Sequence, residues 1–340
     1  MKKTLITGSN FAKKADIIFT QEIHKSEYTH IKSNNHYLIK QNDKKVCYLN
    51  KNFVLHENDI IFCKTDYLNF LFKLLKKNKK LKNIKLITSQ SDRKISRNLY
   101  SKKPECISKW FAVNTLFEND ILKSLPLGLA NDFSEKNLHT DDFINFSSFS
   151  KDLSGVDKVY ANFNENTNYF FRSKVNSNIS KSFFYEKIES TTLSSYKDQL
   201  KEYKYVLCPP GNGLDTHRIW EALYSNSVPV IFKNYYMPYL NNLPCIVIDN
   251  IADLDNKDKY KNFLTSNKTK YIESSFVEWW IERIRGNEKN TTESITIQIS
   301  SLQINLFLFQ NSIKNKILSF KKTTITFCIR LVKKVRRIVY

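Results

Sequence analysis

Residues 205–223 read YVLCPPGNGLDTHRIWEAL, an apolar run followed by a loop and then by a segment with helical spacing. Two of the chain's six glycines, Gly211 and Gly213, fall in this loop. Asp215 or Thr216 precedes the helical segment as a candidate N-cap. The stretch therefore predicts a strand, a glycine loop and a helix in succession, the repeating unit of an α/β protein.

The rest of the chain repeats this alternation of short apolar runs and helical patterns. The runs that we interpret as strands are Asp16–Thr20, His36–Ile39, Lys45–Leu49, Asp59–Lys64, Ile84–Thr88, Lys158–Phe163, Tyr203–Cys208, Val228–Phe232 and Cys245–Ile248. Helical spacing predicts helices over Tyr67–Leu81, Thr167–Asn178, Thr192–Glu202 and His217–Tyr224. Such alternation implies parallel sheets with helices on their faces.

A polar, serine-rich segment from about Asn131 to Asp157 is the most plausible domain boundary. It divides the chain into two α/β domains, 1–150 and 151–290, with a tail over 291–340. Two such domains facing each other leave a cleft where ligands commonly bind.

The tail differs in composition from the two domains. It has no acidic residue from Ser294 to Tyr340, and nine basic residues lie between Lys314 and Arg337 among apolar ones. This pattern predicts a basic amphipathic helix on an anionic membrane surface. A helix docked on the protein body, or a basic helix in solvent, is the alternative.

Charge and cysteine content narrow the class of protein. The 340 residues carry a formal net charge of +21, which implies acidic partners: nucleic acid, anionic lipid or a phosphorylated molecule. Six scattered cysteines show no metal-ligand spacing, so we expect no metal site and a reducing compartment. The basic N-terminus lacks the apolar run of a signal peptide, and no apolar stretch of the sequence is long enough to span a membrane. We expect a cytoplasmic protein, peripheral on the inner face of the cytoplasmic membrane.

The glycine loop and the helix after it have the features of an anion site. A helix N-terminus behind a glycine loop offers free N–H groups and a positive dipole end. His217 and Arg218, in the first turn, add donors for a diphosphate, and Glu221, one turn later, can accept the two hydroxyls of a ribose. The donor-binding candidates of this segment are Gly211, Asn212, Gly213, Asp215, Thr216, Arg218 and Glu221. The alternative is a tight turn with a satisfied N-cap and with Arg218 in solvent.

The segment CPPGNGLDTHRIWEAL (208–223), followed by Ser227-Val228-Pro229-Val230-Ile231, resembles the signature of exostosin-like glycosyltransferases. Further pieces look like the bacterial surface-polysaccharide group of that family, so the resemblance covers roughly residues 60–250. These pieces are Asn162-Phe163, Thr167-Asn168, Arg172, Lys64-Thr65-Asp66, Ser91-Asp92, Trp110-Phe111-Ala112, Asn114 and Leu125–Leu129. Relatives often carry a His where this chain has Ser89-Gln90-Ser91-Asp92.

The resemblance implies a GT-B fold, in which the first Rossmann-like domain binds the acceptor and the second binds the sugar nucleotide. By resemblance, Arg218 neutralises the diphosphate leaving group, Glu221 holds the ribose, and His217 reaches the phosphate or the sugar. Arg172 and Asn162 are further donor-side candidates. The sugar nucleotide is a substrate, so we expect no cofactor.

An inverting transfer also needs a carboxylate that deprotonates the acceptor hydroxyl. Asp92, after the predicted strand Ile84–Thr88, is the first candidate, and Asp66, after Asp59–Lys64, is the second. An Asp after a strand also serves as a helix N-cap, which is the alternative reading of both.

The function predicted from these observations is transfer of a sugar from a nucleotide-diphosphate donor to a lipid-linked or polysaccharide acceptor in cell-surface glycan synthesis, inverting and without metal. Two alternatives stay open. One is a basic protein that binds nucleic acid or an anionic membrane, although the chain shows no nucleic-acid-binding motif. The other is a degenerate glycosyltransferase that acts as a scaffold.

Overall fold

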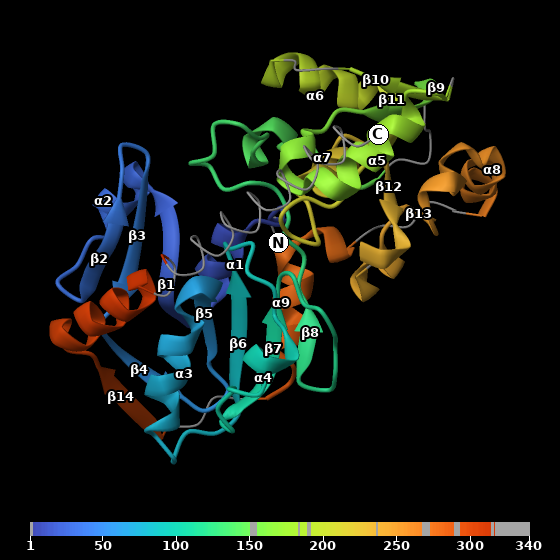
Figure 1. Ribbon diagram of the computed structural model, residues 1–340. Helices are drawn as coiled ribbons and strands as arrows, with labels where there is room; N and C mark the ends of the chain where they lie inside the picture. The colour runs from blue at the N-terminus through green and yellow to red at the C-terminus, as the bar shows by residue number, and fades with distance from the viewer. Residues whose placement is uncertain are drawn as a thin grey trace, which may run out of the picture.

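A computed structural model of the chain describes residues 3–149, 155–182, 184–188, 192–235, 237–266, 273–288, 293–313 and 316. Most strands belong to two sheets, which lie in separate halves of the molecule (Figure 1). The protein is therefore a mixed α/β protein with parallel sheets, as the alternation of apolar runs and helical patterns predicts.

The first sheet has seven strands in the order β2-β3-β1-β5-β6-β7-β8. The neighbouring strands β1, β5, β6, β7 and β8 all run parallel to one another. Strand β3 instead pairs with both β1 and β2 in antiparallel fashion. The strands are β1 (Ile17–His24), β2 (His36–Gln41), β3 (Lys45–Asn50), β5 (Ile60–Lys64), β6 (Ile84–Ser89), β7 (Ile107–Ala112) and β8 (Leu122–Ser124). The helices of this half are α1 (Gly8–Lys14), α2 (Lys25–Ile31), α3 (Leu68–Lys76) and α4 (Arg97–Tyr100).

The second sheet has five parallel strands in the order β10-β9-β11-β12-β13. Its strands are β9 (Val156–Ala161), β10 (Tyr185–Lys187), β11 (Tyr203–Leu207), β12 (Val228–Phe232) and β13 (Ile246–Ile248). Its helices are α5 (Tyr169–Ile179), α6 (Leu193–Glu202), α7 (His217–Tyr224) and α8 (Lys257–Ser266). The strand order reverses between β9 and β11, and in doubly wound sheets ligands bind beyond the carboxyl ends of the strands at such a switch point.

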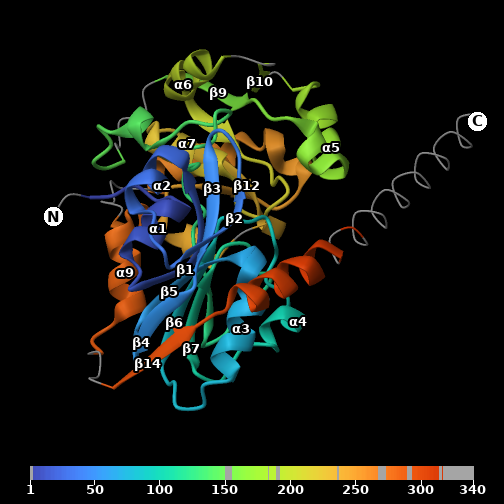
Figure 2. The same ribbon diagram turned by 90° about the vertical axis from the view of Figure 1, so that its left-hand side faces the viewer.

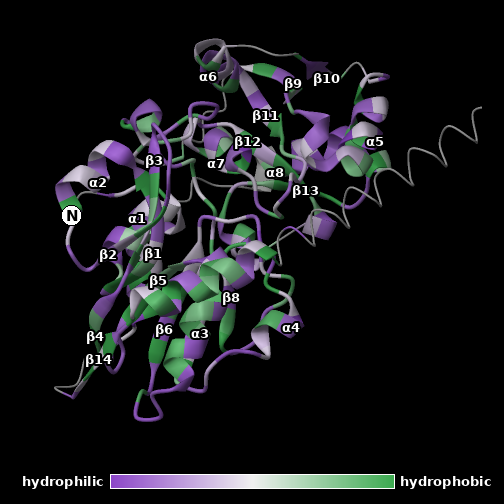
Figure 3. Cartoon of the chain, turned by 60° about the vertical axis from the view of Figure 1, so that its left-hand side comes forward, coloured by the Kyte–Doolittle hydropathy of each residue, from purple (hydrophilic) through white to green (hydrophobic). Residues whose placement is uncertain are grey.

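The sequence pattern explains which faces are buried. All six residues of β6 and all five of β12 are buried, as expected for parallel strands covered on both sides. Helix α3 buries Leu68, Leu71 and Leu75 and exposes lysines, so it shows one hydrophobic and one hydrophilic side (Figure 3). It ends at Lys76, before the Leu81 expected from the spacing.

After the second sheet the chain returns to the first half of the molecule. Helix α9 (Val277–Arg285) reaches the N-terminal segment, where the Thr4 amide and hydroxyl donate to Glu278 at 3.0 and 2.6 Å. Strand β14 (Ser294–Gln298) then pairs with β4 (Asn52–His56) in antiparallel fashion. The helix that follows, residues 301–313, lies against α3 (Figure 2).

Part of the predicted helical tail, 291–340, can thus be described. Residues 294–298 form a strand and 301–313 a helix, while the rest of the basic segment, apart from residue 316, lies outside the described residues. Among the helices described, none is both long and apolar enough to cross a membrane.

Candidate functional site

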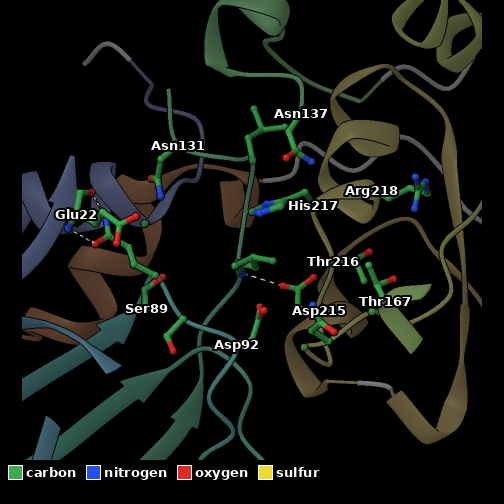
Figure 4. Close-up of a pocket in the computed structure, with 18 of the residues that line it drawn as sticks. Glu22, Ser89, Asp92, Asn131, Asn137, Thr167, Asp215, Thr216, His217 and Arg218 are labelled. Atoms are coloured by element: carbon green, nitrogen blue, oxygen red, sulfur yellow. Dashed lines mark hydrogen bonds between the residues drawn. The ribbon is translucent and has the colours of Figure 1, made fainter. Parts of the chain in front are cut away.

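A cavity of about 570 Å³ lies between the two halves, a size typical of small-molecule sites. One wall comes from the carboxyl ends of β1, β5 and β6, and the other from the loop between β11 and α7 together with α7 itself. Figure 4 shows Glu22, Ser89 and Asn131 on one side, Thr167, Thr216 and Arg218 on the other, and His217 between them.

The cavity brings together most of the residues predicted from the sequence. They are Asp66, Asp92, Arg172, Gly211, Asn212, Gly213, Asp215, Thr216, His217, Arg218 and Glu221. Asn162 is not among the lining residues. It follows β9, and its side-chain amide donates to the Tyr160 hydroxyl at 2.9 Å.

Arg172 holds the glycine loop through the loop's backbone. The buried guanidinium donates to the carbonyls of Pro210 (2.9 Å), Pro209 (2.9 Å) and Asn164 (2.7 Å). Burial, and next the neighbouring charge of Arg218, lower the pKa of Arg172 to about 10, so it stays charged at neutral pH. Arg172 therefore fixes the shape of the loop and adds positive charge behind it.

The Asp215 side chain is buried and accepts hydrogen bonds from three protein groups. Its carboxylate accepts from the Leu127 amide (2.7 Å), the Tyr239 hydroxyl (2.5 Å) and the Trp220 indole (3.2 Å). Burial raises the pKa of Asp215, although these three donors oppose the rise. Its geometry is that of a residue that anchors the start of α7 to residues 125–129.

Two further contacts tie this loop to the first half. Asn114 accepts from the Leu214 amide at 2.8 Å, and a Cβ on Gly213 would lie 2.7 Å from the same Asn114 oxygen. Gly213 is thus required for close approach of the two segments. His217 Nδ1 lies 2.8 Å from the Gly128 carbonyl oxygen. Because only a protonated Nδ1 can donate to a carbonyl, this contact leaves Nε2 for a ligand.

The first turns of α7 carry polar atoms without a protein partner. Among the buried atoms in the described residues, Thr216 Oγ1, Arg218 Nε and Glu221 Oε1 have none. The other Glu221 oxygen accepts from Tyr196 at 2.7 Å, and the Arg218 guanidinium lies over the Tyr196 ring, 5.9 Å from its centre. Burial, and next the charge of Glu221, raise the pKa of Tyr196 well above its ordinary value, so Tyr196 remains a donor.

Unpartnered buried polar atoms are uncommon in folded proteins, because each costs about 1–3 kcal/mol. Of the twelve such atoms in the described residues, four belong to residues that line this cavity: Ser89, Thr216, Arg218 and Glu221. Their gathering makes the cavity a candidate ligand site. The donors of Arg218 and of the free amides suit an anion, whereas the free Glu221 oxygen suits a hydroxyl.

The opposite wall has a cluster of charged side chains. The sequence indicates Lys64 and Asp66 of this cluster but not Glu22 or Lys45. Lys64 lies between Asp66 (3.1 Å) and Glu22 (3.6 Å), and Lys45 also pairs with Glu22. Burial disfavours the charge on Lys64, but Asp66 and Glu22 outweigh it and raise the pKa of Lys64. Asp66 also accepts from Ser91 at 2.8 Å.

Asp92 differs from this cluster because it is exposed at the cavity and makes none of these contacts. The carboxyl ends of adjacent parallel strands meet at one edge, so the positions of Glu22, Lys64 and Asp66 were a signal available in the sequence. Thr167, which was quoted in the resemblance, also lines the cavity, whereas Asn131 lines it without a comparable signal in the sequence.

Within the described ranges, no three His, Cys, Asp or Glu side chains gather in a way that could hold a metal ion. Buried side-chain donors without a protein partner at the cavity include Arg218 Nε, Thr216 Oγ1 and Ser89 Oγ.

Comparison with known proteins gives one sequence relative over part of the chain. A stretch of 77 residues is 38% identical to a probable glycosyltransferase of Arabidopsis thaliana, and it covers 22% of this chain and 14% of the plant protein. The match therefore spans about a seventh of that relative. No protein-family model matches the chain.

Solved structures with some similarity to this chain were also found, including AviGT4 and the GtfA/B complex. AviGT4, a glycosyltransferase involved in avilamycin A biosynthesis, is 11% identical, with 60% of this chain and 68% of that chain covered and a TM-score of 0.31. The GtfA/B complex is 9% identical, with 68% and 58% covered and a TM-score of 0.32. Scores of this size do not establish a shared fold.

Proposed function

We propose that this protein is a glycosyltransferase that moves a sugar from a nucleotide-diphosphate donor to an acceptor hydroxyl. The observation that carries the proposal is the pairing of Arg218 and Glu221 on α7, each with a buried atom that no protein group satisfies. A diphosphate supplies acceptors to Arg218, and a ribose supplies hydroxyls to Glu221. The partial match to a plant glycosyltransferase supports the same class of reaction.

The position of α7 in the sheet adds a second argument. The loop before α7 leaves β11 next to the switch point between β9 and β11, where doubly wound sheets bind nucleotides. We propose a GT-B arrangement, in which this half binds the donor and the first half binds the acceptor.

The reaction then follows from the charges in the cavity. Asp92 takes the proton of the acceptor hydroxyl, and the oxygen attacks the anomeric carbon of the sugar. The bond from that carbon to the phosphate oxygen breaks, and its electron pair leaves with the nucleoside diphosphate. Arg218 and the α7 amides stabilise this developing charge, and the configuration inverts. His217 Nε2 is placed to contact the phosphate or the sugar.

Further parts of the proposal concern substrates and location. We propose that the acceptor is a lipid-linked or polysaccharide glycan at the inner face of the cytoplasmic membrane. We propose further that Arg218 and the N-terminal end of α7 supply the positive charge that the leaving group needs, so the transfer does not require a metal.

Calorimetry of the purified chain with UDP, GDP, CDP, CMP and ADP, with and without Mg²⁺, tests the donor site. We expect one nucleoside diphosphate to bind in both conditions. Arg218→Ala should weaken that binding on the order of a hundredfold, because two charge-assisted hydrogen bonds are lost.

Arg97→Ala is the matched control, since Arg97 is exposed on α4 and does not line the cavity. It should bind like the wild type. Equal binding by the wild type and Arg218→Ala, or no binding of any nucleotide, would contradict the proposed donor site.

A further inference from the structure

The helix over residues 301–313 has two apolar faces, and the protein covers only one of them. On the covered face Ile304 is buried, and Phe307 stacks on Phe70 of α3 with ring centres 4.6 Å apart. On the other face four large apolar side chains recur at helical spacing and are exposed. They are Leu302 (77% exposed), Leu306 (57%), Phe309 (64%) and Ile313 (45%).

A row of exposed apolar residues on one helix face marks an interaction surface. Strand β14, just before the helix, is paired with β4, and the covered face packs on α3. The exposed row is therefore held on the first half of the molecule.

Lysines lie beside the helix that carries this row. The sequence from Tyr67 to Ser91 contains no acidic residue, and its exposed lysines belong to α3 and the turn after it. A hollow of about 330 Å³ between α3 and the 301–313 helix is lined by Lys73, Lys76 and Lys102 together with Phe307 and Gln310. These lysines therefore flank the helix, next to the side on which Phe307 packs against α3.

We infer that the exposed face of helix 301–313 and the lysines beside it form a docking surface for an anionic lipid bilayer. Apolar side chains enter the interface between headgroups and acyl chains, and the lysines neutralise lipid phosphates. The chemistry favours a membrane over a nucleic acid, because a nucleic acid backbone offers no partner for Leu302, Leu306 and Phe309. The sequence after Ile313 has basic and no acidic residues, which complements the same lipid charge.

The helix that carries the docking surface packs close to the acceptor wall of the cavity. Tyr67 contacts Phe307, with ring centres 6.3 Å apart, and Asp66 beside it in the chain lines the cavity. A bilayer bound here therefore lies on the side of the molecule that the proposed function assigns to the acceptor. The lipid binding itself does not depend on that function, because it can be measured without any sugar nucleotide.

The test is sedimentation of the full chain with vesicles of phosphatidylcholine alone and of equal parts phosphatidylcholine and phosphatidylglycerol. We expect binding to the anionic vesicles only, and less of it at high salt. The double variant Leu306→Ser/Phe309→Ser and the double variant Lys73→Gln/Lys76→Gln should each lower the partition coefficient by roughly tenfold or more.

Matched controls are Leu116→Ser, at an apolar residue that is 53% exposed elsewhere, and Lys174→Gln/Lys181→Gln on and after α5. Both should bind vesicles like the wild type, and circular dichroism should show that all variants are folded. The lysine variant keeps the test valid if the apolar variant does not fold.

Three results would overturn the inference: no binding to anionic vesicles, equal binding to neutral ones, or binding that neither test variant reduces. Dimerisation in solution that Leu306→Ser/Phe309→Ser abolishes would also overturn it, since a second copy would then cover this face. If vesicles bind but no nucleotide does, the docking surface stands and the proposed transferase fails.

Discussion

The two walls of the cavity carry their charges in different ways. On the first-half wall, Lys64 lies between Glu22 and Asp66, so cations and anions are matched within the protein. On the α7 wall, Arg218 and Glu221 each keep a buried atom without a protein partner. The difference supports the proposal that a ligand binds at the α7 wall. On the opposite wall the charged groups are paired except for Asp92, and Ser89 Oγ is the buried atom without a partner.

The largest effect should come from the one carboxylate that stands outside the paired cluster. Asp92→Asn is expected to lower kcat by about 10²–10⁴-fold, because the acceptor hydroxyl loses its general base. The affinity for the nucleoside diphosphate should stay unchanged in calorimetry. Asp66→Asn is the matched control, and we expect a far smaller fall in kcat. The reverse order would assign the base to Asp66.

Substitutions of Arg172 and Arg218 on the donor wall should distinguish an effect on protein stability from an effect on nucleotide binding. Arg172→Met removes three hydrogen bonds to backbone carbonyls and should lower the free energy of unfolding by about 3 kcal/mol or more. Arg218→Met should leave that free energy nearly unchanged but should weaken nucleotide binding on the order of a hundredfold, as expected for Arg218→Ala. Urea unfolding followed by tryptophan fluorescence measures the first effect. Similar losses of stability in both variants would show that Arg218 is structural too.

Glu221 offers a smaller and more specific effect. The wild type should bind a ribonucleoside diphosphate about tenfold more tightly than its 2′-deoxy analogue, because the free carboxylate oxygen accepts from a ribose hydroxyl. Glu221→Gln should reduce this preference while the protein stays folded. A wild type that binds both nucleotides equally would remove Glu221 from ribose recognition at the 2′ position.

The smallest effect concerns an ion pair beside the cavity, between Asp142 and Lys197 of α6 (2.9 Å). The pKa of Asp142 lies below its ordinary value. Burial alone would raise this pKa, but the His139 amide and Lys197 stabilise the charged carboxylate and lower it. A carboxyl group whose pKa is lowered in the folded state stabilises the fold at pH values above its pKa in the unfolded state, about 3.9. This stabilisation is lost as the pH falls through the pKa of the folded state.

Asp142→Asn should therefore cost less than about 1 kcal/mol near pH 7, since the pair is partly exposed and screened. The Tm values of the variant and the wild type, measured by thermal unfolding at a series of pH values, should begin to converge as the pH falls below the ordinary pKa of Asp. A difference in Tm that persisted in acid would assign the effect to something other than the charge.

The local elements of the fold could be predicted from the sequence. The apolar runs Ile84–Thr88, Tyr203–Cys208 and Val228–Phe232 are confirmed as strands, and the helix His217–Tyr224 has the predicted bounds. These predictions are correct because buried parallel strands and amphipathic helices leave short-range patterns. The pairing of β14 with β4 leaves no such pattern, since it joins residues far apart in the chain.

For the site, the sequence identified the segment but not the task of each side chain. Asp215 and Arg218 are three positions apart and both are charged. The Asp215 carboxylate accepts hydrogen bonds from protein groups, whereas Arg218 Nε has no protein partner. Residue type and spacing do not separate these two cases, because two of the three donors to Asp215 come from the distant residues 127 and 239. Only the three-dimensional structure places them together.

The β4–β14 pair has a consequence for synthesis of the chain. Strand β4 is complete by residue 56, but its partner begins at residue 294. At a translation rate of roughly 5–20 residues per second, the ribosome needs about 10–50 seconds to make the intervening chain. Throughout that interval β4 lacks this partner, and an unpaired strand is a template for association with other chains. The nascent first half is therefore a predicted client for chaperones until the last strand emerges.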